Sequence, residues 1–333
     1  MKIQEFRDML KKCKRDDVEK IASELYKMMP KSKKEDEVDP LVHDIISGKA
    51  VTYSSKSKSS NNATVDYETL KKDILTFLNY VDNGYYYVPN RVVPKAKRSK
   101  WRFEVKNFIK AINEMPVDGE NGAESALLLR KIYSRLCHGC GYYIFSSEDP
   151  FASIGMGQTV YYEMLIKRTF ATGYTDENMR NMLLDATCTN LDRYTLHSDL
   201  EAIYVKSLPT TDLKYKAQEL IKEYVKQFER ELKTVRKQSH EFYNIQRKIK
   251  EMAATLLLTS IALCEMEAGL EYYYKNDKDT NKEVILFGLL YALDRCGEDK
   301  TWISVYEDGI ARGIEPRDRL KEIYAEKIEK RGK

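Results

Sequence analysis

Apolar residues recur at intervals of three and four along much of this chain. The pattern is clearest in TTDLKYKAQELIKEYVKQFERELKTVRKQ, residues 210–238, where charged residues fill the face opposite the apolar one. This spacing matches the helical period and predicts one long amphipathic helix. Its apolar positions are Leu213, Ala217, Leu220, Ile221, Tyr224, Val225, Phe228, Leu232 and Val235.

Helix start and stop signals flank other periodic runs. Side chains that cap helix N-termini precede several of these runs, and glycines follow others. The expected starts are Asp16, Ser99 and Thr175, and the expected stops are Gly297 and Gly313, with Pro316 opening a last helix through Ile328. The C-terminal third therefore reads as a row of antiparallel helical hairpins.

The most apolar run is MAATLLLTSIALC, residues 252–264. It is shorter than the roughly 20 residues that cross a bilayer, so we expect a buried helix that contains Cys264, and no membrane association. The first residues mix charged with apolar side chains, which is unlike a secretory or transit segment. Six cysteines are scattered singly or in one close pair, so we expect mostly buried thiols in a reducing compartment and a cytoplasmic protein.

Two stretches interrupt the helical pattern. Residues 52–64 are polar and rich in serine, which predicts a flexible linker. Residues 83–100 hold two prolines and three consecutive tyrosines, which predicts a loop with extended character or a short hairpin. We therefore expect an N-terminal helical unit at 1–50, a linker at 51–66, a basic helical segment at 67–115 and a helical array at 116–333.

Length and composition favour an all-α fold. The 333 residues include only 15 Gly and 8 Pro, too few turn formers for a protein rich in strands. Together with the predicted hairpins, this indicates an irregular α-solenoid in which each antiparallel hairpin buries its apolar face on its neighbours, with a small helical unit at the N-terminus.

Residues 285–320, ILFGLLYALDRCGEDKTWISVYEDGIARGIEPRDRL, resemble one helix-turn-helix unit of the tetratricopeptide and pentatricopeptide class. The likeness lies in small and apolar residues on a first helix, CGEDKTW at the turn and VYEDGIARG on a second helix. It covers about a tenth of the chain, and no second copy follows at a fixed period. The resemblance implies stacked hairpins. The opening, residues 16–46, is also similar to the first helices of small uncharacterised bacterial helical domains.

Charge is distributed unevenly along the chain. The net charge is +4, but residues 1–115 hold 24 of the 56 basic and only 17 of the 52 acidic residues. Arg98, Arg102, Lys106 and Lys110 follow one another at intervals of four, which predicts a basic ridge beside an apolar stripe on one helix. The loop before them adds further cations. The candidate nucleic-acid-binding residues are Lys95, Lys97, Arg98, Lys100, Arg102, Lys106 and Lys110, and the apolar stripe is Trp101, Val105, Phe108, Ile109 and Ile112.

The stretch RLCHGCGYYIF, residues 135–145, places Cys137, His138 and Cys140 close together. A structural zinc site needs four ligands, and no second close pair of cysteines or histidines exists. A redox pair of the thioredoxin type would follow a strand, whereas this one follows a helical pattern. We therefore expect no metal site, but a helix that continues or kinks at Gly139 and Gly141, whose small size lets a neighbour pack closely.

Other candidate chemistry lacks its partners. His43 beside Asp44 has no upstream histidine for an HD-type metal site, and His240 beside Glu241 lacks the second histidine of the zincin motif. The glycines in ASIGMGQT, residues 152–159, lack the lysine of a phosphate loop, so a turn before the next helix is expected. We infer neither an enzyme nor a cofactor.

Tyrosine is abundant, with YYY at 85–87 and again at 272–274 among 24 residues in all. Such runs either line a ligand groove or pack as half-buried wedges at helix ends, and we favour the wedges. The sequence thus predicts a non-catalytic scaffold that binds a protein or peptide partner. The alternative is weak, sequence-independent nucleic-acid binding through residues 95–110.

Overall fold

The chain is all-helical. The structure, a computed structural model, describes residues 9–29, 38–39, 42, 66–87, 92–279 and 281–331. Of these residues 74% are helical, and none of them forms a strand. The all-α prediction is therefore confirmed. The chain divides into two compact units, residues 1–64 and 65–333.

The first unit contains α2, Arg15–Met28. The start predicted at Asp16 lies inside its first turn, because the helix begins one residue earlier, after Lys14. Asp16 and Asp17 still favour this end of the helix electrostatically, since they lie near the positive end of its dipole. His43 and nearly all of the predicted linker at 51–66 lie outside the described residues.

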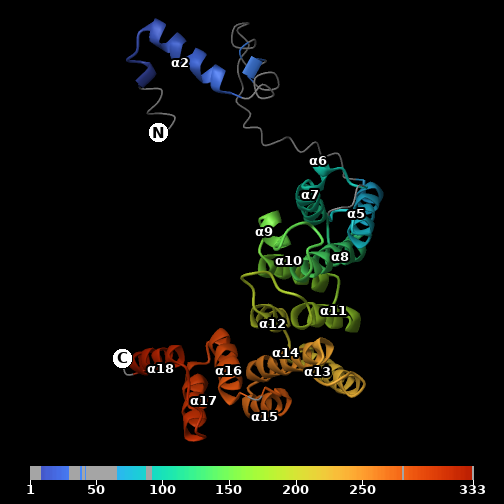
Figure 1. Cartoon of the computed structure of the whole chain (residues 1–333), viewed down its shortest axis with the longest axis vertical. Helices are drawn as coiled ribbons and strands as arrows, with labels where there is room; N and C mark the ends of the chain where they lie inside the picture. The colour runs from blue at the N-terminus through green and yellow to red at the C-terminus, as the bar shows by residue number, and fades with distance from the viewer. Residues whose placement is uncertain are drawn as a thin grey trace. The chain divides into compact units, whose positions relative to one another are not determined.

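The second unit consists of helices joined by short connections, and Figure 1 traces them in chain order. They are α5 (Tyr67–Asp82), α6 (Lys95–Arg98), α7 (Trp101–Glu114), α8 (Gly122–Gly141), α9 (Pro150–Ile154), α10 (Gln158–Ala171), α11 (Asp176–Thr187), α12 (His197–Lys206), α13 (Thr211–Leu232), α14 (His240–Ala262), α15 (Met266–Asn276), α16 (Lys282–Cys296), α17 (Asp299–Ala311) and α18 (Asp318–Arg331).

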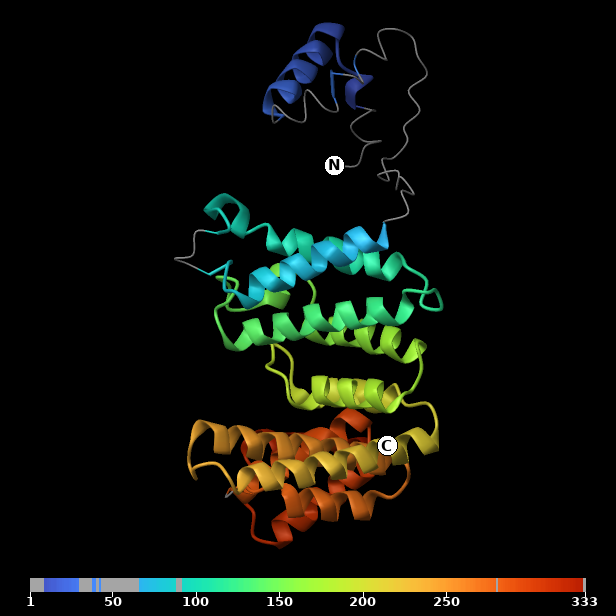
Figure 2. The same ribbon diagram turned by 90° about the vertical axis from the view of Figure 1, so that its right-hand side faces the viewer.

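The helices of the second unit lie in successive layers (Figure 2). The first layer, α5 and α7, packs on α8, and α8 packs on α10. Next, α11 and α12 contact both α10 and α14, and α14 also packs against α13 and α15. At the other end α16 contacts α12 and α14, and it leads to α17 and α18. Residues 67–115 are thus part of the same compact unit as the helices that follow them.

Local signals fix many helix ends. The predicted start at Thr175 is confirmed, because its hydroxyl accepts a hydrogen bond from the backbone N–H of Asn178 at 3.1 Å. The predicted stop at Gly297 is confirmed too, since this residue caps α16 in the left-handed region with φ of 72°. Ser99 is not an N-cap. It ends the single turn of α6, and Lys100 precedes α7.

The helix predicted from the pattern at 210–238 is α13, whose buried residues include Leu220, Ile221 and Val225. The apolar run that follows it is also buried, in α14, and it serves two hydrophobic cores. Met252 and Leu256 belong to a large core that extends back to α5, and Leu257 belongs to a smaller core with α15 to α18. Cys264 was expected in this helix, but it is exposed and lies just beyond it with φ of 61°.

The glycines of the 135–145 stretch allow close packing, as predicted. The helix α8 continues through Gly141. A Cβ atom at Gly139 would lie 2.8 Å from Cγ of Pro150, and one at Gly141 would lie 2.4 Å from the side-chain nitrogen of Asn190. A side chain at either position would therefore collide with the segments packed against α8.

Of the segment 83–100, predicted to be a loop with extended character or a short hairpin, the structure describes residues 83–87 and 92–100, and one helical turn interrupts the loop. Residues 83–86 form a turn after α5, and Lys95–Arg98 form the helical turn α6. The residue directly before α6 is Pro94, whose fixed φ of −55° suits the entry into a helix. This segment closes one end of the space between α5 and α7.

Candidate binding groove between α5 and α7

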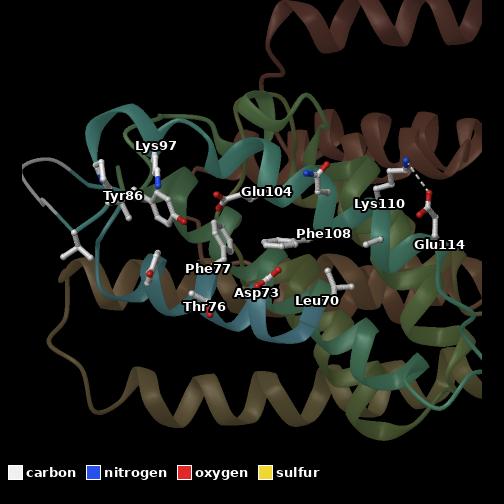
Figure 3. Close-up of a pocket in the computed structure, with 16 residues that line it drawn as sticks. Leu70, Asp73, Thr76, Phe77, Tyr86, Lys97, Glu104, Phe108, Lys110 and Glu114 are labelled. Atoms are coloured by element: carbon white, nitrogen blue, oxygen red, sulfur yellow. Dashed lines mark ion pairs between the residues drawn. The ribbon is translucent and has the colours of Figure 1, made fainter. Parts of the chain in front are cut away.

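The inner faces of α5 and α7 enclose a groove of about 840 Å³ at the first layer of the second unit (Figure 3). Its walls follow helical spacing, so that each helix contributes one face. The α5 wall is Leu70, Asp73, Thr76, Phe77 and Tyr80, and the α7 wall is Glu104, Asn107, Phe108, Lys110, Ala111 and Glu114. Tyr86, Val92, Val93, Pro94 and Lys97 close one end.

The floor of the groove is aromatic. Phe77 is buried and Phe108 half-buried, and their ring centroids lie 5.9 Å apart in an edge-to-face arrangement. Tyr86 is 4% exposed, and its ring centroid lies 5.7 Å from that of Phe77. Below them Phe145 stacks on Trp101, which anchors α7. The rings therefore form a packed cluster in which only Phe108 keeps one side open to the groove.

Acidic side chains stand on both walls. Figure 3 shows Asp73 of α5 and Glu104 of α7 on opposite sides of the Phe77 and Phe108 rings. Burial raises the pKa of Tyr86 well above its usual range, and the nearby charge of Glu104 raises it further. Tyr86 therefore stays protonated at neutral pH, with its hydroxyl facing Glu104 (Figure 3).

Basic side chains stand at the two ends of the groove. Lys97 lies beside Tyr86, and Lys110 at the other end forms an ion pair of 3.6 Å with Glu114 (Figure 3). Within the described part of the chain, neither Asp73 nor Glu104 forms an ion pair. The central part of the groove is therefore aromatic and negative.

The structure separates the seven predicted basic residues. Arg98 belongs to α6, not α7, and its Nε donates a hydrogen bond to the carbonyl oxygen of Val93 at 2.9 Å. The prediction that all four residues of the ridge lie on one helix is therefore wrong, because the helix is interrupted at Ser99 and Lys100, between α6 and α7. Of the seven, only Lys97 and Lys110 line the groove. The exposed residues outside it are Lys95, Lys100, Arg102 and Lys106.

The apolar stripe on α7 does dock on the fold, with Trp101, Val105, Ile109 and Ile112 all buried. Phe108 differs, because it lies at the edge of this stripe and turns towards the groove. The tyrosine run at 85–87 combines the two expected roles. Tyr86 packs in the core and lines the groove, whereas Tyr87 is 47% exposed.

The cysteine and histidine residues of the 135–145 stretch do not converge on one point. Cys137 is buried, where burial raises the pKa of its thiol, whereas His138 is exposed and stacks on Tyr142. Burial likewise raises the pKa of Cys140 to about 12. Across the described residues, no group of three or more His, Cys, Asp or Glu side chains is arranged to hold a metal ion.

A second polar cluster, between α12 and α14, is largely buried. Glu201 is fully buried, and of its neighbours Glu251 raises its pKa most. Burial and the neighbouring carboxylate raise the pKa of Glu201 well above its usual range. His197 lies on the same side, where its ring Nε2 is 3.0 Å from a guanidinium nitrogen of Arg247. We therefore expect the titration of this cluster to affect folding stability.

Comparison with models of known protein families, with curated proteins and with solved structures finds no match to this chain. Among the described residues, no helix combines the length and the apolar character that crossing a membrane would require.

Proposed function

We propose that this chain is a non-catalytic helical scaffold that binds a protein or peptide partner in the groove between α5 and α7. The observation that carries the proposal is the aromatic floor of a groove of about 840 Å³, which is open at the first layer of the unit. A helical segment presents apolar side chains every three or four residues, which suits a groove between two helices. Aromatic residues also contribute much of the binding energy at protein interfaces.

The layered contacts of α5 to α18 support the further proposal that the second unit is an irregular α-solenoid. Most layers contact only their neighbours in chain order, and such arrays commonly present long surfaces to partners. In this proposal the hairpin of α16 and α17, at the stretch that resembles tetratricopeptide units, belongs to the same stack. Its role is to extend the scaffold away from the groove.

The test compares two phenylalanines of α7 by affinity capture from native cytosol treated with nuclease. Phe108 lines the groove, whereas Phe103 is 55% exposed and lies outside it. We expect a protein partner that is captured by the parent and by Phe103→Ala but lost by Phe108→Ala. A partner that binds Phe108→Ala as well as the parent would contradict the proposed groove, provided that the variant melts as a folded protein.

Nucleic-acid binding is a second candidate, favoured by one observation. Of the seven basic residues between 95 and 110, only Lys110 forms an ion pair with another described residue. Unpaired cations can follow a phosphate backbone, with binding that weakens steeply as salt is added. The candidate surface is the exposed set outside the groove, Lys95, Lys100, Arg102 and Lys106.

Charge reversal at Lys100, Arg102 and Lys106 tests this candidate. We expect the parent to bind single-stranded or duplex DNA at about 50 mM salt, and the triple glutamate variant to bind less tightly with a flatter salt dependence. The matched control reverses Lys222, Lys226 and Arg230, three exposed residues on α13. Equal loss in both variants would show that net charge, not this surface, determines binding.

A further inference from the structure

We infer that the groove between α5 and α7 selects a partner segment that carries a basic side chain, arginine above all, and holds that side chain between Asp73 and Glu104. This inference rests on the proposed function of the groove and adds the chemical class of its occupant. It follows from the opposition of two carboxylates across an aromatic floor.

The geometry of the groove suits a cation. Asp73 projects from α5 and Glu104 from α7, and the rings of Phe77 and Phe108 lie between them (Figure 3). A cation above this floor meets a carboxylate on each side and the open side of the Phe108 ring below. Cations within about 6 Å of an aromatic ring centroid are attracted by its π-electrons, and a carboxylate at each wall adds a charge-assisted hydrogen bond.

The basic residues at the ends leave both carboxylates without an ion pair. Lys110 is paired with Glu114, and Lys97 lies beside Tyr86 on the Glu104 side of the groove, where the described residues show no ion pair between Lys97 and Glu104. Asp73 and Glu104 form no ion pair with any other described residue, so an incoming cation does not have to displace one. An anionic side chain in the same place would face two like charges.

Arginine fits this arrangement better than lysine. Its guanidinium group is planar, so it stacks on an aromatic ring while its edges donate hydrogen bonds to carboxylates on both sides. The ammonium group of lysine is a compact point charge and satisfies one wall at a time. The volume of about 840 Å³ also exceeds that of one side chain, so the remainder accommodates apolar neighbours on the same helical face.

The experiment uses three acetylated and amidated 14-residue peptides, identical except at one central position. Each has leucines along one helical face, and the central residue is arginine, leucine or glutamate. Binding to the full chain is measured by isothermal titration calorimetry. We expect the arginine peptide to bind about tenfold more tightly than the leucine peptide, and the glutamate peptide to bind least tightly.

Two variants of the groove test the origin of this order. Asp73→Asn with Glu104→Gln keeps the shape but removes both charges, and it should bind the arginine and leucine peptides equally. Asp73→Lys with Glu104→Lys should reverse the order and prefer the glutamate peptide. Glu68→Lys is the matched control, because Glu68 is exposed on α5 outside the groove. It should leave the preference unchanged.

The outcomes separate this inference from the proposed function. If the parent binds the arginine and leucine peptides equally, the groove binds peptides but the basic preference is wrong. If the parent binds none of the three peptides, both the groove function and the preference are contradicted. A reversed preference in the double lysine variant supports the inference directly, since an unfolded variant would bind no peptide selectively.

Discussion

Phe77 of α5 and Phe108 of α7 meet edge to face, with ring centroids 5.9 Å apart, but only Phe77 is fully enclosed. Phe77 is 2% exposed and also contacts Tyr86 and Phe145. Phe108 is half-buried and has one side open to the groove. The pair therefore joins the core of the first layer to its binding surface.

This difference predicts unequal effects of truncation on stability. Phe77→Ala leaves a cavity in the core and should lower the free energy of unfolding by about 3–5 kcal/mol. Phe108→Ala removes mainly an exposed ring contact and should cost only about 1–2 kcal/mol. Urea unfolding followed by circular dichroism measures both. Equal losses would show that Phe108 is a core residue and that the groove is filled.

A second prediction concerns Glu201, whose pKa is raised by burial first and then by Glu251. In an unfolded chain this carboxyl group ionises near pH 4.5, whereas in the folded protein it keeps its proton to higher pH. Below pH 4.5 Glu201 is protonated in both states and does not lower the free energy of unfolding. As the pH rises from there towards the folded pKa, the free energy of unfolding falls. Glu201→Gln should raise the melting temperature at pH 7 and have little effect at pH 4.

The measurement for Glu201 is the melting temperature of parent and variant at several pH values. The gain from Glu201→Gln should grow steadily with pH between 4.5 and 7. Glu68→Gln, at an exposed position, serves as the control and should show no such trend. A gain of the same size at pH 4 and pH 7 would mean that folding does not shift the pKa of Glu201.

A third prediction concerns His197, whose effect on stability has the opposite dependence on pH. Burial, helped by the charge of Arg247, lowers the pKa of His197 to about 4 from the usual 6.5. The folded state therefore resists protonation, and stability is lost as the pH falls from 6.5 towards 4. Between pH 7 and pH 5 this loss amounts to about 2 kcal/mol.

Replacement by glutamine removes this sensitivity to acid. The free energy of unfolding of His197→Gln, relative to the parent, should therefore rise by about 2 kcal/mol between pH 7 and pH 5. His240→Gln is the control, since His240 is exposed at the start of α14. Parallel pH curves for the parent and His197→Gln would contradict the prediction.

A fourth prediction concerns the close packing of α8. Gly139→Ala places a Cβ atom 2.8 Å from Pro150 and 2.9 Å from Phe145, so it should lower the free energy of unfolding by about 1–3 kcal/mol. Gly119→Ala is the control, because its nearest contacts would be at an ordinary 3.6 Å. The melting temperatures of the two variants test this prediction. If Gly139→Ala melts at the same temperature as the parent, α8 has room for a side chain at this position.

The helices could be predicted from sequence because their signals are local. Periodicity identified α13, a capping hydroxyl identified the start of α11, and Gly297 identified the end of α16. The same reasoning failed where periodicity was extended across a break. Arg98 precedes Arg102 by four residues, as one helix would require, but α6 ends at Arg98 and α7 begins only at Trp101.

The groove could not be predicted in the same way. Asp73 and Glu104 belong to different helices, and their opposition depends on how α5 and α7 pack over α8. No local pattern carries that information. Two signals were available: Phe108 at the edge of the α7 stripe, and the tyrosine run that supplies Tyr86.

Hydrogen exchange measured by mass spectrometry tests the central claim most directly. The full chain is compared with and without the peptide that carries a central arginine. If the groove is the binding site, exchange slows in residues 67–82 and 101–114, the helices α5 and α7, and stays unchanged in α16 to α18. Binding with slower exchange only outside α5 and α7 would contradict the account.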